Sequence, residues 1–348
     1  MPATIGVITN PNSKKNWRSK GRSGRLEKML GKRGVLKRTR TLEELPDAID
    51  DLLDAGCEYL VCDGGDGTLH WATNTAFDRL RARGETPDKL PVIVPTNGGT
   101  VDFVARKAGL KGEAESILVR LIDVLDRGDR PETITVDTCR HHGSVIDEQG
   151  ERADFDRLGI ATAVGGVGAN FFDKFYKLPK TRGAAEIAGV IGAAAGGAVV
   201  QSLGPALRRL APNTLREYGE TFFKPTRARI EVDGTALAST EFIALQVGAV
   251  DINLAGILRC FPLAESPGAI HFQALDSTPM GAVANIPSIV FGARLLGRNV
   301  FDDRIAHVKI TADPGYAIDP VIDGEQFYGL GELNLSLGPS MQVPVLPS

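Results

Sequence analysis

Cysteine is scarce in this 348-residue chain, and its spacing gives no paired motif. Four cysteines, Cys57, Cys62, Cys139 and Cys260, are scattered without a Cys-x-x-Cys pair. This pattern favours a reducing compartment and argues against a zinc site. The first residues, MPATIGVITNPNS, also lack the charged start and long apolar run of a signal peptide. We therefore expect a cytoplasmic protein.

A long run of large apolar residues is missing as well. The most membrane-like stretch, Gly192 to Gly204, is dominated by alanine and glycine and lies close to Glu186. It has too few large apolar side chains to span a bilayer, and a packed helix is the better interpretation. The chain also shows no internal repeat and no low-complexity linker.

The chain has no strong excess of positive or negative charge. A net charge of −3 gives no global signature of polyanion binding, so we expect no nucleic-acid partner. Between Lys14 and Arg40, however, twelve Lys and Arg residues stand against one acid, Glu27. Two interpretations stay open for this basic segment. It is either a solvated helix face or a surface for polyphosphate and anionic lipid headgroups.

The first third of the chain alternates between strand-like and helix-like segments. With 43% apolar residues, the chain is long enough for two domains. The alternation predicts a parallel sheet with helices on both faces. The expected strands are residues 5–9, 35–41, 59–62 and 90–95. A first helix is expected to end near residue 30, and three further helices are expected at residues 42–56, 68–83 and 101–109.

After about residue 129 the pattern changes to short period-two runs separated by turns. Asp233-Gly234 between two such runs is a strong hairpin signal. This predicts a mainly antiparallel β domain, with one helical excursion between about Gly183 and Leu210. The predicted domains are residues 1–128, with residues 325–348 as a candidate completion, and residues 129–324, which would bind the substrate.

The sequence GGDGT lies where the third strand should meet a helix. Gly64, Gly65 and Gly67 lack the Cβ atoms that would keep phosphate from the backbone, and they permit positive φ angles. The helix start adds partial positive charge. Asp66 would repel phosphate unless a divalent cation lies between them. The alternative is that Asp66 only caps the helix.

Two further loops are expected at the same sheet edge. NPNSKK, residues 10–15, follows the first strand, and PTNGGTVDF, residues 95–103, follows the fourth. Both combine turn formers with hydroxyl groups. Ligands bind beyond the carboxyl ends of strands in such sheets, so the three loops together predict a phosphate site. The chain contains neither GxxxxGK[ST] nor a strand-anchored GxGxxG.

These motifs resemble a known family. NPNS, GGDGT, a Pro-x-x-Gly-Gly-Thr-x-Asp-Phe-x-x-Arg loop and a DGE at Asp323–Glu325 are similar to the diacylglycerol kinase catalytic-domain family. That family includes bacterial lipid kinases and the sphingosine and ceramide kinases, with a more distant link to NAD kinase. The resemblance spans nearly the whole chain and is strongest over residues 5–110.

The resemblance implies an α/β nucleotide-binding domain, a β-rich domain, and an active site in the cleft between them. It implies ATP and Mg²⁺ as cofactors and a lipid hydroxyl as phosphoryl acceptor. Glu325 would be the proton acceptor, with Asp323 beside it and Asp66 near the magnesium; an ordinary turn at DGE is the alternative. The implied nucleotide contacts are Asn10, Pro11, Asn12, Ser13, Lys14, Thr41, Gly64, Gly65, Asp66, Gly67, Thr68, Leu69, Gly98, Gly99 and Thr100, with Thr96 as the second choice for the loop threonine.

The sequence departs from the family pattern in two places. Val101 replaces an expected asparagine, and Pro267 precedes Gly268 where a metal-binding aspartate is expected, which leaves Glu265 as no more than a candidate substitute at the second magnesium site. Two alternative functions stay open: an NAD kinase-like phosphotransferase on a soluble acceptor, and a binding module that has lost catalysis. We expect a lipid substrate, peripheral contact with an anionic membrane, a role in phospholipid metabolism and a candidate homodimer.

Overall fold

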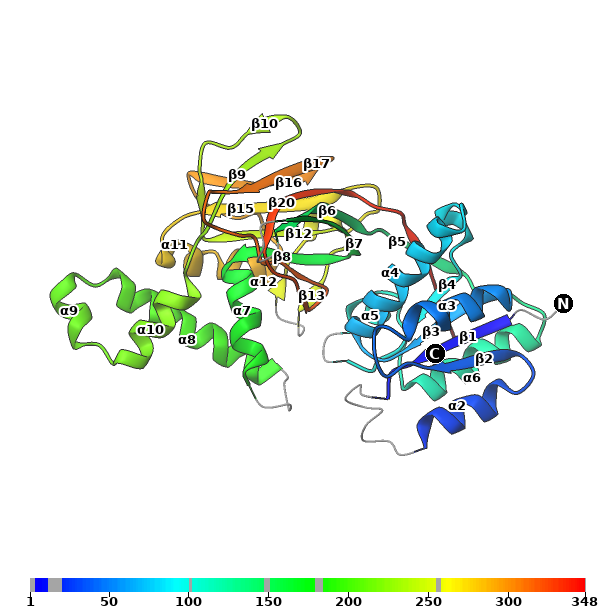
Figure 1. Cartoon of the computed structure of the whole chain (residues 1–348). Helices are drawn as coiled ribbons and strands as arrows, with labels where there is room; N and C mark the ends of the chain where they lie inside the picture. The colour runs from blue at the N-terminus through cyan, green and yellow to red at the C-terminus, as the bar shows by residue number, and fades with distance from the viewer. Residues whose placement is uncertain are drawn as a thin grey trace. The chain divides into compact units, whose positions relative to one another are not determined.

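The computed structural model describes residues 4–11, 21–99, 102–146, 151–178, 184–254 and 258–347. The chain divides into two units, Met1–Val136 with Pro339–Ser348 (unit 1) and Asp137–Gly338 (unit 2). The sequence analysis places the corresponding boundaries at residues 128 and 325. Figure 1 shows the elements of each unit.

Unit 1 is built on a parallel sheet with the strand order β2-β1-β3-β4. In this sheet Val7 lies opposite Leu36 on one side and Val61 on the other. The predicted parallel sheet is therefore confirmed, but β2 ends at Arg38 rather than at Thr41. Arg38 pairs with Thr9, the last residue of β1, and the contact of β2 with β1 then ends in a single hydrogen bond from the Thr39 N–H to the Thr9 carbonyl at 3.1 Å. The strands are β1 Thr4–Thr9, β2 Gly34–Arg38, β3 Cys57–Asp63 and β4 Val92–Pro95.

Helices cover both faces of this sheet. α2 packs against α6, and α3 packs against α4. Helix α3 shows the cause, because Leu45, Ile49 and Leu52 recur at helical spacing and are all buried. Helix α6 was not predicted from the sequence. The helices are α2 Arg22–Leu30, α3 Leu45–Asp54, α4 Asp66–Ala82, α5 Phe103–Lys107 and α6 Ala114–Asp126, with a short 3₁₀ turn at Pro87–Lys89.

The last segment of the chain returns to unit 1. Strand β5 (Thr133–Val136) pairs antiparallel with β21 (Met341–Pro344), so that Ile134 lies opposite Val343. The Val345 N–H then donates to the Glu132 carbonyl at 2.8 Å. Unit 2 is thus inserted between the main part of unit 1 and its last segment.

Unit 2 is a sandwich of two antiparallel sheets. One has the order β10-β9-β17-β20-β6-β7, with β11 also paired to β9; the other has the order β16-β15-β12-β8-β18-β19. The predicted antiparallel β domain is confirmed. The strands are β6 Cys139–Ile146, β7 Arg152–Gly159, β8 Ala161–Gly166, β9 Thr226–Val232, β10 Thr235–Ala236, β11 Glu241–Phe242, β12 Ala244–Gly248, β15 Ile270–Asp276, β16 Asn299–Ile305, β17 His307–Ala312, β18 Val321–Ile322, β19 Glu325–Gln326 and β20 Leu330–Leu337, with a separate β13–β14 pair at Asn253–Leu254 and Leu258–Arg259 and a 3₁₀ turn at Pro262–Ala264.

Alternating side chains fill the space between the two sheets. Ile230 on β9 and Leu333 on β20 meet Phe272 on β15 in one buried cluster. The β9–β10 turn confirms the predicted hairpin, since Asp233 and Gly234 both have positive φ angles, 48° and 80°. The period-two pattern of the strands specifies which side chains face the core. The Asp-Gly pair specifies the tight turn between them.

The helical excursion between β8 and β9 is longer than predicted. It begins with α7 (Val167–Tyr176) and continues through α8 (Ala184–Ser202), α9 (Pro205–Leu210) and α10 (Asn213–Phe222). Helices α8 and α10 cross closely, because a Cβ atom on Gly197 would lie 2.8 Å from the Gly219 Cα. Two short helices, α11 (Pro279–Ala284) and α12 (Ile286–Phe291), follow β15, and α11 packs on α8.

Helix α8 is long and apolar enough, by length and composition alone, to cross a membrane, although only 33% of its Ala185–Ser202 segment is buried. Its buried side includes Ile187, Val190, Ala194 and Ala198, which pack with Phe171 and Phe222. The prediction of a packed helix is therefore correct for one side of α8. The opposite side faces away from the rest of unit 2.

Candidate active site

The candidate site in unit 1 lies at the carboxyl ends of β1, β3 and β4. Asn10 follows β1, and its N–H donates to the Asp63 carbonyl at 3.4 Å, which joins the first loop to the GGDGT strand. Pro11 comes next in the described chain. Four predicted contacts, Asn12, Ser13, Lys14 and Thr100, and the departure Val101, lie outside the described residues.

The two glycine loops pack directly against each other, backbone to backbone. The Gly98 N–H donates to the Gly64 carbonyl at 2.9 Å. A Cβ atom on Gly98 would lie 2.2 Å from the Gly64 oxygen, and a Cβ atom on Gly65 would lie 2.6 Å from the Gly99 Cα. The expected use of positive φ angles is wrong here, because Gly65 has φ −98°. These glycines serve close approach.

We expect a Gly98→Ala substitution to destabilise unit 1 by about 1–3 kcal/mol, because the new methyl group meets fixed backbone atoms rather than a movable side chain. The measurement is the thermal unfolding midpoint of the purified protein, together with its affinity for ATP. Gly24→Ala is the matched control, since Gly24 lies in α2 and a Cβ atom there meets nothing within 4 Å. Equal stability of Gly98→Ala and the parent protein would contradict the interlocked loops.

The Thr96 side chain also connects the two glycine loops. Its hydroxyl accepts a hydrogen bond from the Gly64 N–H at 3.2 Å and lies 3.1 Å from the Cys62 carbonyl and 3.2 Å from the Gly64 carbonyl. The side chain is buried. The hydroxyl is thus fully engaged by the protein backbone, which supports the preference for Thr100 over Thr96 as the loop threonine.

Asp66 joins the first turn of α4 to the second glycine loop. Its Oδ2 accepts the Asp102 N–H at 2.8 Å and its Oδ1 accepts the Phe103 N–H at 3.2 Å. Asp102 itself has φ 50°, and its carboxylate accepts the Gly99 N–H at 2.7 Å. Asp66 therefore does cap a helix, but the helix is α5 across the loop rather than α4.

The chemistry of this turn suits a divalent cation beside a phosphate, because Mg²⁺ is typically held by one or two carboxylates together with phosphate oxygens. Asp66 is half-buried, as are Gly65, Gly67 and Thr68 beside it. The first N–H groups of α4 have no intrahelical acceptor, and the helix dipole favours an anion there. The residues present thus fit a polyphosphate and its divalent metal, with Asp66 as the carboxylate ligand. Leu69 is buried under this turn and has a packing role.

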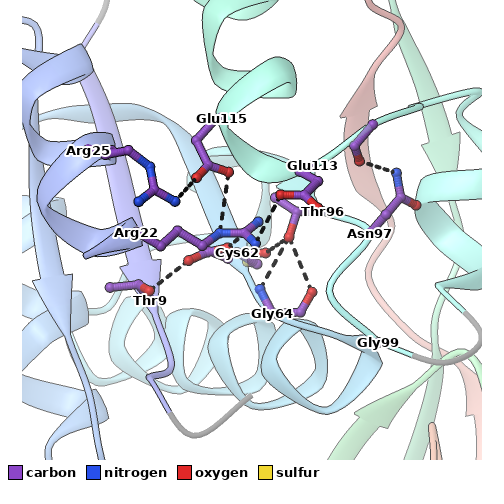
Figure 2. A network of polar contacts seen from close by, with 12 residues as sticks. Thr9, Arg22, Arg25, Cys62, Gly64, Thr96, Asn97, Gly99, Glu113 and Glu115 are labelled. Atoms are coloured by element: carbon purple, nitrogen blue, oxygen red, sulfur yellow. Dashed lines mark hydrogen bonds and ion pairs between the residues drawn. The ribbon is translucent and has the colours of Figure 1, made fainter. Parts of the chain in front are cut away.

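A buried charged network, not predicted from the sequence, lies beside these loops (Figure 2). Thr9 donates to Asp63 at 2.7 Å, and the Arg22 guanidinium lies 3.4 Å from the other Asp63 oxygen. Arg22 is 2% exposed and also pairs with Glu113 and Glu115, at 3.6 and 3.4 Å. The network ties the ends of β1 and β3 to the starts of α2 and α6. It fixes the strand ends from which the site loops emerge.

The sequence contained a partial signal for this network. Arg22 was interpreted only as one residue of a basic surface, yet it is the first residue of α2 and fully covered. Asp63 directly precedes GGDGT at the end of an apolar strand, a position where a lone carboxylate needs a cation partner. The pairing itself depends on tertiary structure, because Arg22 and Glu115 are far apart in the chain.

The DGE motif in unit 2 forms the tight turn between β18 and β19. Asp323 and Gly324 have φ angles of 51° and 88°. The Asp323 carboxylate accepts the N–H groups of Ile160 and Ala161 at 2.8 and 2.9 Å, so it anchors the turn to the start of β8. The Tyr176 hydroxyl donates to the Gly324 carbonyl from α7. The contacts of Asp323 are therefore those of a positioning residue.

Glu325 begins β19 directly after this anchored turn and is half-buried. The turn fixes its backbone while leaving the side chain next to a solvent-accessible surface. The two remaining candidates have local partners. Thr41 is exposed, and its hydrogen bond to Glu43 lowers the pKa of that carboxyl group. Glu265 pairs with Arg259 at 3.0 Å, which makes it a poor replacement for the missing metal-binding aspartate.

Comparison with known proteins identifies the N-terminal region. Residues 4–132 match the family model described as diacylglycerol kinase catalytic domain. No curated protein matches the chain. Solved structures do match along the whole length, and three from Bacillus anthracis strain Sterne illustrate the similarity.

The first is a candidate diacylglycerol kinase with 12% identity and a TM-score of 0.60, covering 98% of this chain and 96% of that chain. The second, a diacylglycerol kinase, has 12% identity and a TM-score of 0.54, covering 99% and 97%. The third, another candidate diacylglycerol kinase, has 13% identity and a TM-score of 0.58, covering 98% and 96%. At such identities these structures establish the two-domain fold. The family match itself covers residues 4–132, and this region is therefore similar in sequence to the diacylglycerol kinase catalytic domain.

Proposed function

We propose that this protein is an ATP-dependent lipid kinase, which transfers the γ-phosphoryl group of ATP to a lipid hydroxyl group. The observation that carries the proposal is the position of Asp66. It lies in the region that matches the family model, within the first of two interlocked glycine loops and at the half-buried amino end of a long helix, and it bonds to the second loop. A carboxylate beside an anion-binding backbone is the arrangement that a magnesium–polyphosphate complex requires.

In this proposal the residues of unit 1 bind and orient the nucleotide. The backbone N–H groups of Gly67 and Thr68 bind phosphate oxygens, and the glycine contacts hold both loops in place. Bound magnesium would neutralise the charge that develops on the transferred group. The Arg22–Asp63 pair fixes the strand ends beneath the loops.

The residues of unit 2 prepare the acceptor. Glu325 accepts the proton of the attacking hydroxyl group, the general-base role in phosphoryl transfer. Asp323 and Tyr176 hold the turn that presents Glu325. The lipid acceptor implies at least transient contact with a membrane surface, and we propose that the protein is peripheral there.

The test is consumption of ATP by the purified protein with Mg²⁺, screened against diacylglycerol, sphingosine, ceramide, phosphatidylglycerol and NAD in mixed micelles. We expect turnover with a lipid acceptor and none without Mg²⁺. If NAD is the one acceptor in the screen that supports turnover, the acceptor is a soluble molecule and not a lipid. ATP binding without turnover on any of these acceptors would contradict the kinase assignment and favour a binding module.

A further inference from the structure

The helical excursion of unit 2 exposes apolar side chains that are not part of the β-sandwich core. We define the excursion tip as residues 199–216, which comprise the end of α8, all of α9 and the start of α10. We propose that this tip docks the protein peripherally on an anionic lipid bilayer. The inference rests on the proposed function, because it names the surface by which a lipid kinase reaches its substrate.

Large apolar side chains on the tip face solvent. Leu210 is 82% exposed and Leu207 57% exposed, and they lie three residues apart on one face of α9. Val199 and Leu203, at the end of α8, are 52% and 36% exposed. Figure 1 shows α9 at the end of the excursion that is farthest from the two sheets. Clustered exposed leucines on a protruding element are typical of a binding surface rather than a core.

Basic residues lie beside these leucines, and Glu217 and Glu220 follow them on α10. Residues 187–216 contain three arginines, Arg208, Arg209 and Arg216, and neither aspartate nor glutamate. Arg209 is exposed, whereas Arg208 donates to Gln201 and pairs with Glu220 at 2.8 Å. Basic residues beside exposed leucines complement the acidic headgroups and acyl boundary of an anionic bilayer.

The packing of α8 favours docking over spanning. One side of α8 is buried against Phe171 on α7 and Phe222 on α10, inside the folded unit. Gly197 and Gly219 bring α8 and α10 into backbone contact, which a bilayer-spanning α8 would have to break. Within the described part of the excursion, the outer face of α8 and the α9 tip can meet lipid without loss of this packing.

The basic segment between Lys14 and Arg40 is less suited to this role within its described part. Arg22 is buried among carboxylates, and Arg25 pairs with Glu115 at 3.0 Å. Arg38 pairs with Glu27 at 2.6 Å, and Lys37 and Arg33 pair with Asp51 and Asp126. Internal pairing removes much of the charge that an anionic surface would attract.

The test is co-sedimentation of the full chain with vesicles of equal parts phosphatidylcholine and phosphatidylglycerol. We expect Leu207→Glu combined with Leu210→Glu to weaken binding about 100-fold or more, since each buried leucine contributes roughly tenfold to partitioning. Arg209→Glu should weaken binding to these vesicles but not to pure phosphatidylcholine. A polarity-sensitive fluorophore on Leu210→Cys should report an apolar environment when the vesicles are added.

Val119→Glu is the matched control, because Val119 is an exposed apolar residue on α6 of unit 1 and 40% exposed. It should bind vesicles like the parent protein, and all variants should keep the parental unfolding midpoint. Parental binding by the double leucine variant would overturn the proposal. So would a parent protein that ignores the vesicles, or one that resists extraction from membranes by alkaline carbonate, which indicates a spanning helix.

Failure of docking and failure of the proposed kinase activity give different results. Vesicle binding is measured without nucleotide, and turnover is measured separately on a short-chain lipid acceptor below its micellar concentration. Loss of docking with this turnover intact would remove only the surface assignment. Vesicle binding without any ATP consumption would support the docking surface and contradict the proposed kinase activity.

Discussion

Glu325→Gln is expected to lower turnover about a thousandfold while the affinity for ATP stays unchanged. A positioned general base contributes about 10²–10⁴-fold to such reactions, and the amide cannot accept the proton of the hydroxyl group. The substitution keeps the size of the side chain and the Asp323 contacts that hold the turn. The loss should therefore fall on kcat rather than on folding or on nucleotide binding.

The measurement is steady-state turnover with the lipid acceptor found in the screen, with ATP affinity determined by calorimetry. Glu231→Gln is the control, because Glu231 is an exposed glutamate on β9 of the same unit. It should keep parental kinetics. If Glu325→Gln retained the parental kcat, Glu325 would be an ordinary residue of a tight turn.

Asp66→Asn is expected to lower turnover by a similar factor, about a thousandfold, for a different reason. Stabilisation of the transition state by a bound metal supplies several kcal/mol, and an amide is a much weaker magnesium ligand than a carboxylate. The same substitution replaces the acceptor of the Asp102 and Phe103 N–H groups, which should lower the unfolding free energy by about 1–2 kcal/mol.

Two readouts separate these roles of Asp66. The metal role predicts that the Mg²⁺ concentration for half-maximal turnover rises strongly, whereas the capping role predicts only a lower unfolding midpoint. Asp78→Asn on the same helix is the control, because Asp78 forms an ion pair with Arg81 three residues further along α4. A variant Asp66→Asn with reduced stability but parental kcat would reduce Asp66 to the cap of α5.

Much of unit 1 could be predicted from the sequence because its signals are local. Apolar strands, helical spacing in α3 and glycines at strand ends each identify an element within a few residues. The errors arise where distant contacts decide. Strand β2 ends at Arg38 because β1 ends at Thr9, and Asp66 caps α5 because the two glycine loops interlock. Such facts depend on pairing rather than on local composition.

The candidate site shows the same division. The glycines and Asp66 stand out in the sequence, but Arg22 gives no local sign that it will be buried beside Asp63. Asp323 was predicted next to the chemistry, yet its carboxylate holds the backbone of Ile160 and Ala161. The hydrogen-bond partners of Asp323, which decide between catalysis and support, lie 163 and 162 residues away in the chain.

The β5–β21 pair has a consequence for synthesis on the ribosome. Strand β5 emerges about two hundred residues before its partner Met341–Pro344, so nascent unit 1 carries an open strand edge throughout translation of unit 2. An unpaired edge is a site for wrong association, and closing so long a loop slows completion. Unit 1 therefore completes its fold only after strand β21 has been synthesised.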